Sequence, residues 1–152
     1  MRQRFFTFVR SLLILATLAG AVVLWMYWQQ RNLSLSSSEF ALALTESVLS
    51  STSAQPLLDS SHVRLMEGWD AQDLQNYINL IPIRMGELRA LVSINGGVET
   101  LPVPFLNRPV EAVYQIGADF AEESAICQVG LIYQDGQWLV ADFVLDALLM
   151  SD

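Results

Sequence analysis

The feature that most constrains this chain is an uncharged apolar stretch near its N-terminus. Residues 11–28 read SLLILATLAGAVVLWMYW, with no charged side chain at any position. A helix rises 1.5 Å per residue, so these 18 residues cover roughly 27 Å, close to the thickness of the hydrocarbon core of a bilayer. Aromatic rings at the end of such a stretch favour the membrane interface, and an arginine near the other end can reach the headgroups. We therefore predict a membrane-spanning helix whose interface anchors are Arg10, Trp25, Tyr27 and Trp28.

A cleaved signal peptide is the rival interpretation of this stretch. Residues 18–21 contain small residues that a signal peptidase accepts, but cleavage there would leave an apolar N-terminus starting at Val22. The uncharged core is also longer than the roughly 7–15 residues of the apolar region of a signal peptide. Length and flanking residues both favour an uncleaved anchor. Within it, Ala16, Ala19 and Gly20 form a small-residue patch that either packs another helix or is ordinary lipid-facing composition.

The distribution of charge predicts which way the anchor points. Arg2, Arg4 and Arg10 precede the span, and only Arg31 follows it closely. The excess of positive charge places the N-terminus in the cytoplasm and residues 33–152 across the membrane. All 16 acidic residues and four arginines lie in this second part, which gives it a net charge of −12. The chain has no lysine, so no nucleic-acid partner held by phosphate neutralisation is expected.

These patterns divide the chain into four parts on an inner (cytoplasmic) membrane. The four parts are a cytoplasmic N-terminus (1–10), a transmembrane helix (11–30), a polar Ser-rich linker (31–38) and a periplasmic or otherwise extracytoplasmic domain (39–150). The first expected partner is the lipid bilayer. The last part is long enough to bury a single core.

The domain begins with a pattern typical of helices. The first helix is expected to start at the capping-box pair Ser36 and Glu39. The second has Pro56 in its first turn. The third runs from an Asp70 cap to Pro82, which is expected to end it.

After Gly86 the apolar residues recur with period two, which predicts strands. We expect a first strand over 88–94 that ends at an Asn-Gly-Gly turn, an edge strand over 98–105, and further strands over 110–120, 125–133 and 137–145. Asp135-Gly136 between the last two is a strong hairpin signal. The prediction is thus an α+β fold with one N-terminal transmembrane helix, followed by a cone-like domain of about three helices on a curved antiparallel sheet of four to five strands.

This order of elements resembles the nuclear-transport-factor-two-like superfamily, also called the ketosteroid-isomerase or SnoaL type. The resemblance covers about residues 38–149, and the last hairpin, YQDGQWLV over 133–140, is similar to the Gly-x-Trp strand of many members. A single membrane helix carrying such a domain also resembles the bitopic scaffold subunits of type IV secretion machines. The resemblance implies a cone that is either filled or hollow, and enzymes of this type place an acid or His dyad and a Tyr inside it.

The candidate lining residues of that cone are Tyr77, Tyr114, Trp138 and Asp142. Asp142 shares the strand parity of Trp138, so it is either a costly buried carboxylate that acts as a base, or a residue that faces solvent at a strand bend or pairs with Arg84 or Arg89. His62 and Asp59 form either an acid–base pair or a contact on the surface of a helix. Cys127 is expected to be a buried small hydrophobe rather than a reactive thiol. No catalytic residue, metal site or cofactor is assigned.

The sequence therefore favours a non-enzymatic, membrane-anchored interaction or scaffold module of an envelope protein complex, with other membrane or periplasmic proteins as partners. Two alternatives stay open. One is a domain that binds a small apolar ligand in the cone, and the other is an isomerase- or hydrolase-like enzyme that uses Asp142 or His62.

Overall fold

The computed structural model describes residues 2–99 and 109–147, with the backbone alone over residues 2–12. Within these residues a long N-terminal helix leads into three short helices and a four-stranded sheet. The elements are α1 (Arg2–Ser51), α2 (Gln55–Asp59), α3 (Val63–Gly68), α4 (Ala71–Met85), β1 (Leu88–Val98), β2 (Val110–Phe120), β3 (Ser124–Gln134) and β4 (Gln137–Ala147). This is the predicted α+β arrangement.

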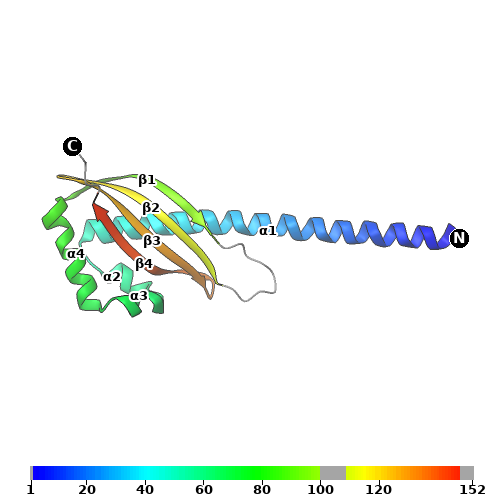
Figure 1. The fold of residues 1–152 in the computed structure, drawn as a ribbon, viewed down its shortest axis with the longest axis horizontal. Coiled ribbons are helices and arrows are strands. Elements are labelled where there is room, and N and C mark those ends of the chain that lie inside the picture. The colour runs from blue at the N-terminus through cyan, green and yellow to red at the C-terminus, as the bar shows by residue number, and fades with distance from the viewer. Residues whose placement is uncertain (1, 100–108, 148–152) are drawn as a thin grey trace.

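Helix α1 is continuous over 50 residues and projects far out of the domain (Figure 1). Between Leu13 and Trp25 every side chain is exposed, whereas the C-terminal part packs against the sheet. The apolar part is long enough to cross a membrane, which is compatible with a single-pass anchor.

The polar segment predicted as a linker over 31–38 is instead part of α1. Three successive serine hydroxyls donate to the carbonyl oxygens three residues earlier, at distances between 2.9 and 3.1 Å. These bonds satisfy the hydroxyls within the helix, so a Ser-rich composition did not require a break. Leu33 and Ser37 of this segment are buried in the domain. The expected helix start at Ser36 is therefore wrong, because the helix has already run for more than 30 residues at that point.

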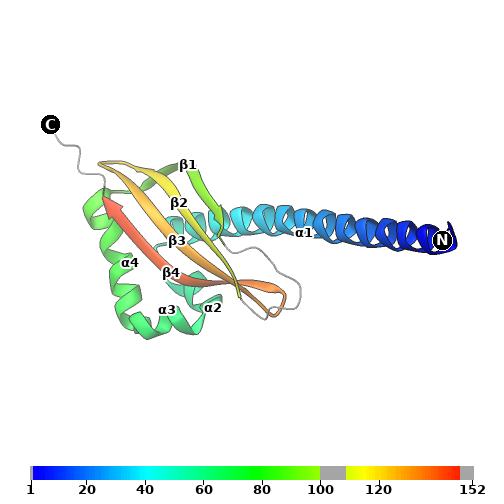
Figure 2. The ribbon, with the colours of Figure 1, turned by 45° about the vertical axis from the view of Figure 1, so that its right-hand side comes forward.

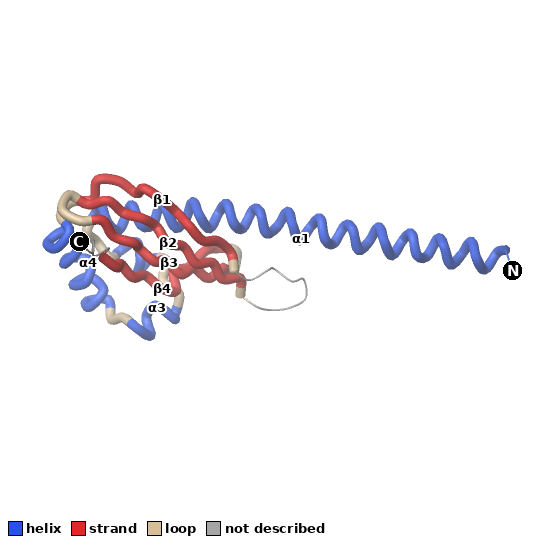
Figure 3. Tube along the Cα trace, turned by 45° about the horizontal axis from the view of Figure 1, so that its top comes forward, coloured by secondary structure: helices blue, strands red, loops and turns tan. Residues whose placement is uncertain are grey.

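The four strands form one open antiparallel sheet in the order β1-β2-β3-β4 (Figure 3). Strand β2 alternates as predicted, with Ala112, Tyr114, Ile116 and Ala118 buried. Asp135 and Gly136 have positive φ values of 52° and 84°, as the expected β3–β4 hairpin requires. The edge strand predicted over 98–105 falls mainly on residues outside the described ranges.

Strand β1 departs from the expected alternation. Its pairing with β2 shifts register twice, so Leu88, Leu91 and Ile94 contact the core in place of the alternating set. The predicted turn at Asn95-Gly96-Gly97 is also wrong, since β1 continues through it. Gly96 adopts φ +123°, and a Cβ atom there would lie 2.1 Å from the carbonyl oxygen of Val113. The glycine thus permits close approach of two strands rather than a reversal of the chain.

The short helices and the end of α1 cover one face of the sheet (Figures 1 and 2). The predicted second helix is two helices, α2 and α3, because residues 60–62 pair with the edge of β4. Asp70 caps α4 as expected, accepting from the backbone N–H of Gln72 at 3.2 Å. Pro82 does not end α4, which continues to the buried Met85 and stops at Gly86.

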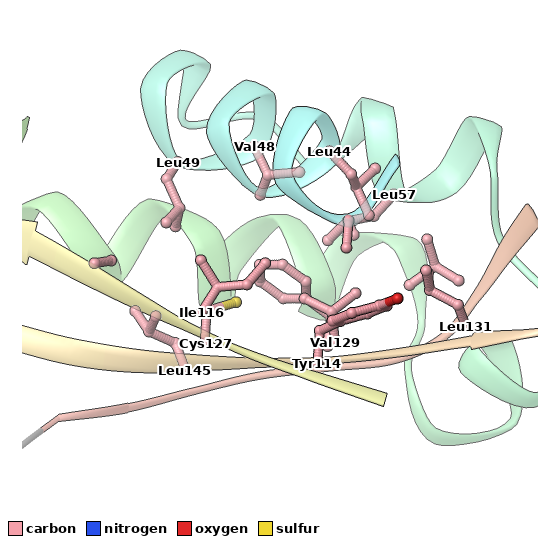
Figure 4. Close-up of a cluster of buried hydrophobic side chains, with 14 of the residues drawn as sticks. Leu44, Val48, Leu49, Leu57, Tyr114, Ile116, Cys127, Val129, Leu131 and Leu145 are labelled. Atoms are coloured by element: carbon pink, nitrogen blue, oxygen red, sulfur yellow. The ribbon is translucent and has the colours of Figure 1, made fainter. Parts of the chain in front are cut away.

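The core forms where α1 meets the sheet. Leu44, Val48 and Leu49 of α1 point at Ile116 of β2 and at Val129 of β3 (Figure 4). All five are buried. Burying one such side chain stabilises a fold by about 1.5–3 kcal/mol, so the end of the membrane helix is a structural part of the domain.

We expect Gly96→Ala to destabilise the full chain by about 1–3 kcal/mol, because the added Cβ meets the backbone of β2 and the residue loses its preferred positive φ. Gly97→Ala is the matched control, since a Cβ at Gly97 meets nothing within 4 Å. The free energy of unfolding in urea, measured in mild detergent, checks both. Equal losses for the two variants would contradict the assignment.

Candidate functional site

Two of the predicted cone residues hold the membrane helix against the sheet. The Tyr114 hydroxyl lies 2.6 Å from the Ser37 hydroxyl and donates to the Ser34 carbonyl at 3.3 Å. The Trp138 indole N–H donates to the Ser36 hydroxyl at 3.0 Å. Tyr114 and Trp138 are buried, as a cone interior requires, but their polar atoms bond to α1.

Tyr77 has a different role, at the edge of the sheet. Its hydroxyl accepts from the Leu145 backbone N–H at 2.9 Å and donates to the Leu145 carbonyl at 3.3 Å. Burial raises the pKa of this phenol above its ordinary value of 10.0. A neutral tyrosine can therefore act as donor and acceptor at once toward the backbone of Leu145 in the edge strand β4.

Asp142 faces away from the interior. The β3–β4 pairing shifts register so that Leu131 pairs with Val140 whereas Gly130 pairs with Asp142. The extra residue, Ala141, reverses the strand parity beyond it. Before the bulge, Trp138 and Val140 face the core. After it, Phe143 faces the core and Asp142 is exposed. This is the second of the two readings that the sequence allowed.

The interior that the four candidates were expected to line is filled by side chains. Ile116, Val129 and Leu131 are each at most 1% exposed and lie between the sheet and the helices (Figure 4). Phe143 is also fully buried in this core. Asp142 lines one of the two cavities described below, whereas Tyr77, Tyr114 and Trp138 line neither of them.

A cavity of about 590 Å³ lies instead at the end of the domain opposite the apolar part of α1. Its lining comes from the ends of α1 and α4, the start of β1 and the end of β2. These element ends lie at the end of the domain far from the N-terminus (Figure 1). Its lining residues are Leu49, Ser50, Thr52, Ile81, Pro82, Gly86, Glu87, Leu88 and Phe120. We call it the distal cavity.

A smaller cavity of about 200 Å³ lies beside the outward residues of β2 and β3. Arg64 of α3 lines it and forms an ion pair with Glu111 at 3.7 Å, with both side chains substantially exposed. Asp142 and Glu99 also line it. An exposed pair of this kind contributes little to stability.

Cys127 is fully buried beside Thr45 of α1. Burial raises the pKa of its thiol from 9.0 to about 12, and a hydrogen bond with Thr45 opposes the shift only in part. The thiol is therefore neutral at physiological pH and behaves as the small hydrophobe that the sequence predicted.

His62 is the N-cap of α3. Its Nδ1 accepts from the backbone N–H of Arg64 at 3.2 Å, and its own backbone N–H donates to the Val140 carbonyl at 2.8 Å. Asp59 accepts from the Gln55 side-chain amide at 2.6 Å. Both residues thus have structural bonds in place of the proposed acid–base pairing.

The predicted membrane-interface anchors follow one another along the free part of α1. Trp25, Tyr27 and Trp28 are 47%, 65% and 65% exposed, so no protein contact in the described structure competes with lipid for these rings. The patch of Ala16, Ala19 and Gly20 is also exposed. Arg10 belongs to α1, and its side chain lies outside the described part of the structure.

Among the described residues no cluster of three or more His, Cys, Asp or Glu side chains could hold a metal ion. In comparisons with known proteins, no family model, no curated protein and no solved structure matches this chain. The resemblance to nuclear-transport-factor-two-like domains therefore stays a prediction.

Sequence reasoning missed the residues of α1 that bond to side chains of the sheet. Ser36, Ser37 and Thr45 bond to Trp138, Tyr114 and Cys127 in turn. The signal was a spacing: Ser37, Ala41, Leu44 and Val48 continue one helical stripe at i, i+4, i+7 and i+11. A serine in such a stripe is a small polar residue at a buried position, not a sign of a linker.

We expect Ser37 and Tyr114 to be coupled energetically. In a double-mutant cycle of Ser37→Ala and Tyr114→Phe, the coupling free energy should be about 0.5–1.5 kcal/mol. The same cycle with Ser38→Ala is the control, since the Ser38 hydroxyl donates to the Leu35 carbonyl of its own helix. Unfolding in mild detergent measures both cycles. A Ser37 coupling no larger than that of Ser38 would overturn the assignment.

We expect the Cys127 thiol to be inert in the folded protein. It should not react with iodoacetamide at pH 8 until the protein is unfolded, because almost no thiolate forms when the pKa is about 12. Since the folded pKa is raised, its stabilising effect is complete below pH 9 and is lost as the pH rises toward 12. Cys127→Ala should therefore reduce the slope of stability against pH in this window. Rapid alkylation of the native chain would refute the prediction.

Proposed function

We propose that this chain is a membrane-anchored, extracytoplasmic interaction or scaffold module of an envelope protein complex, and that it is not an enzyme. The observation that carries the proposal is the continuity of α1, whose exposed apolar part leads without a break into the buried core. A module attached in this way presents its surface to partners at a constant height and angle above the bilayer.

The height follows from the helix geometry. From Trp28, the last aromatic anchor, to Leu33, the first buried residue, α1 advances by five residues, or roughly 7.5 Å. The domain thus begins within the headgroup layer of a bilayer that covers the apolar stretch. A flexible tether would let the domain move freely, whereas this helix restricts it.

The placement of the chemically versatile side chains also supports a binding role. Tyr77, Tyr114 and Trp138 use their polar atoms to bond to backbone or to α1, and Asp142 faces outward. An acid–base mechanism needs such groups within reach of one substrate atom. Here they stabilise the packing of the sheet and helices, which leaves the outer surface for interactions.

The proposal includes an orientation, with the N-terminus in the cytoplasm and the acidic domain on the far side of an inner membrane. Its support is the arginine excess before the span. An acidic domain so close to lipid should also prefer zwitterionic to anionic headgroups.

A cysteine-labelling experiment tests this orientation. In spheroplasts, a membrane-impermeant maleimide should label Ser47→Cys, whose position on α1 is exposed, whereas the original chain with its buried Cys127 should not react. Gln3→Cys on the cytoplasmic side should be labelled only after lysis. Protection of Ser47→Cys together with labelling of Gln3→Cys would reverse the orientation.

The interaction role is tested by photo-crosslinking of the full chain in its native membrane. A photoreactive residue at exposed positions of the domain, such as Ile83 and Val92, should yield discrete higher-mass adducts. Replacing residues 13–24 by leucines separates contacts of the domain, which should persist, from contacts between membrane helices. A chain that is monomeric in mild detergent and gives no adducts at any position would refute the proposal.

A further inference from the structure

The distal cavity lies too far from the bilayer to be covered by lipid. Leu49 in its lining is 21 residues beyond Trp28 on the same continuous helix, a rise of roughly 32 Å. The cavity therefore opens into the aqueous space at the end of the domain that points away from the membrane. Whatever occupies it comes from that space.

The lining combines an apolar floor with one negative charge. Leu88 and Pro82 are half-buried, and Leu49 and Phe120 lie almost fully buried behind them. Glu87 is the one charged residue of the lining. Arg84 and Arg89 are close in sequence but do not line the cavity.

A second acidic side chain, Glu122, lies next to one lining residue, although it is not itself part of the lining. The Cγ atom of Glu122 is 3.4 Å from the place that a Cβ at Gly86 would occupy, and Gly86 is part of the lining. Since residues 33–152 carry a net charge of −12, a positively charged ligand is favoured both locally and at long range.

Two exposed apolar side chains of α4 lie next in sequence to residues that line the cavity. Ile81 and Pro82 line the cavity, while Leu80 and Ile83 on the same turn are 46% and 75% exposed. A small molecule is usually enclosed over most of its surface. A partly open cavity whose lining residues have exposed apolar neighbours in the same helix fits a segment of another protein better, with one anchor side chain inserted.

We infer that the distal cavity is a docking site for a basic segment of an extracytoplasmic partner protein, which inserts a large apolar side chain beside a lysine or arginine. The apolar side chain rests on Leu88 and Pro82, and the cation faces Glu87 and Glu122. This inference depends on the proposed interaction function and names the place and the chemistry of one partner.

The test uses the full chain in phosphatidylcholine nanodiscs and a displayed library of random decapeptides as the probe. Empty nanodiscs remove peptides that bind lipid. The enriched peptides should share a Trp, Phe or Leu within two positions of a Lys or Arg. Their affinity should fall at least about tenfold for Ser50→Trp, which fills the mouth of the cavity, and about threefold for Glu87→Gln and in 0.5 M salt.

Ser47→Trp is the matched control, because Ser47 is an exposed residue of the same helix that does not line the cavity. It should leave peptide affinity unchanged. Enriched peptides without basic residues, or peptides that bind Ser50→Trp as tightly as the original chain, would overturn the inference. If photo-crosslinks still form elsewhere on the domain, the interaction function stands and only the docking site is refuted. Absence of both would refute both.

Discussion

The contact between the C-terminal part of α1 and the concave face of the sheet is the interaction on which the rest of the structure depends. One helix has to satisfy two environments, because its first part exposes apolar side chains in every direction and its last part buries only one stripe. A continuous backbone hydrogen-bond ladder joins the two parts. The core of the domain is consequently built on the membrane helix, and removal of α1 would remove one wall of that core.

The polar atoms of the two large rings at this contact are both satisfied by serines of α1. Tyr114 and Trp138 are large rings with one polar atom each, and a buried polar atom without a partner is costly. Ser37 and Ser36 supply those partners at 2.6 and 3.0 Å. The same requirement governs the β4 edge, where Tyr77 bonds to both backbone groups of Leu145. Residues 60–62 pair with Val140 farther along that strand, and an edge blocked in this way does not readily accept another strand.

The fold also separates two regions along the axis of α1. Near the membrane end the aromatic anchors of α1 are free to contact lipid. At the other end, the distal cavity and the exposed apolar residues of α4 face water. Because the helix between them is unbroken, the distance between the two regions is a property of the fold and does not depend on a flexible segment.

The sequence by itself determined the features that depend on local pattern. The apolar stretch, the alternation of β2, the Asp70 cap and the Asp135-Gly136 hairpin follow from side chains that are close in sequence, and each is present in the structure. Only the tertiary structure decided features that depend on pairing between distant segments. A single bulged residue, Ala141, places Asp142 on the solvent side of β4. Gly96 lies within strand β1, where the sequence Asn-Gly-Gly predicted a turn. The buried Ser37 of the Ser-rich segment meets Tyr114, 77 residues away, and no local pattern contains that contact.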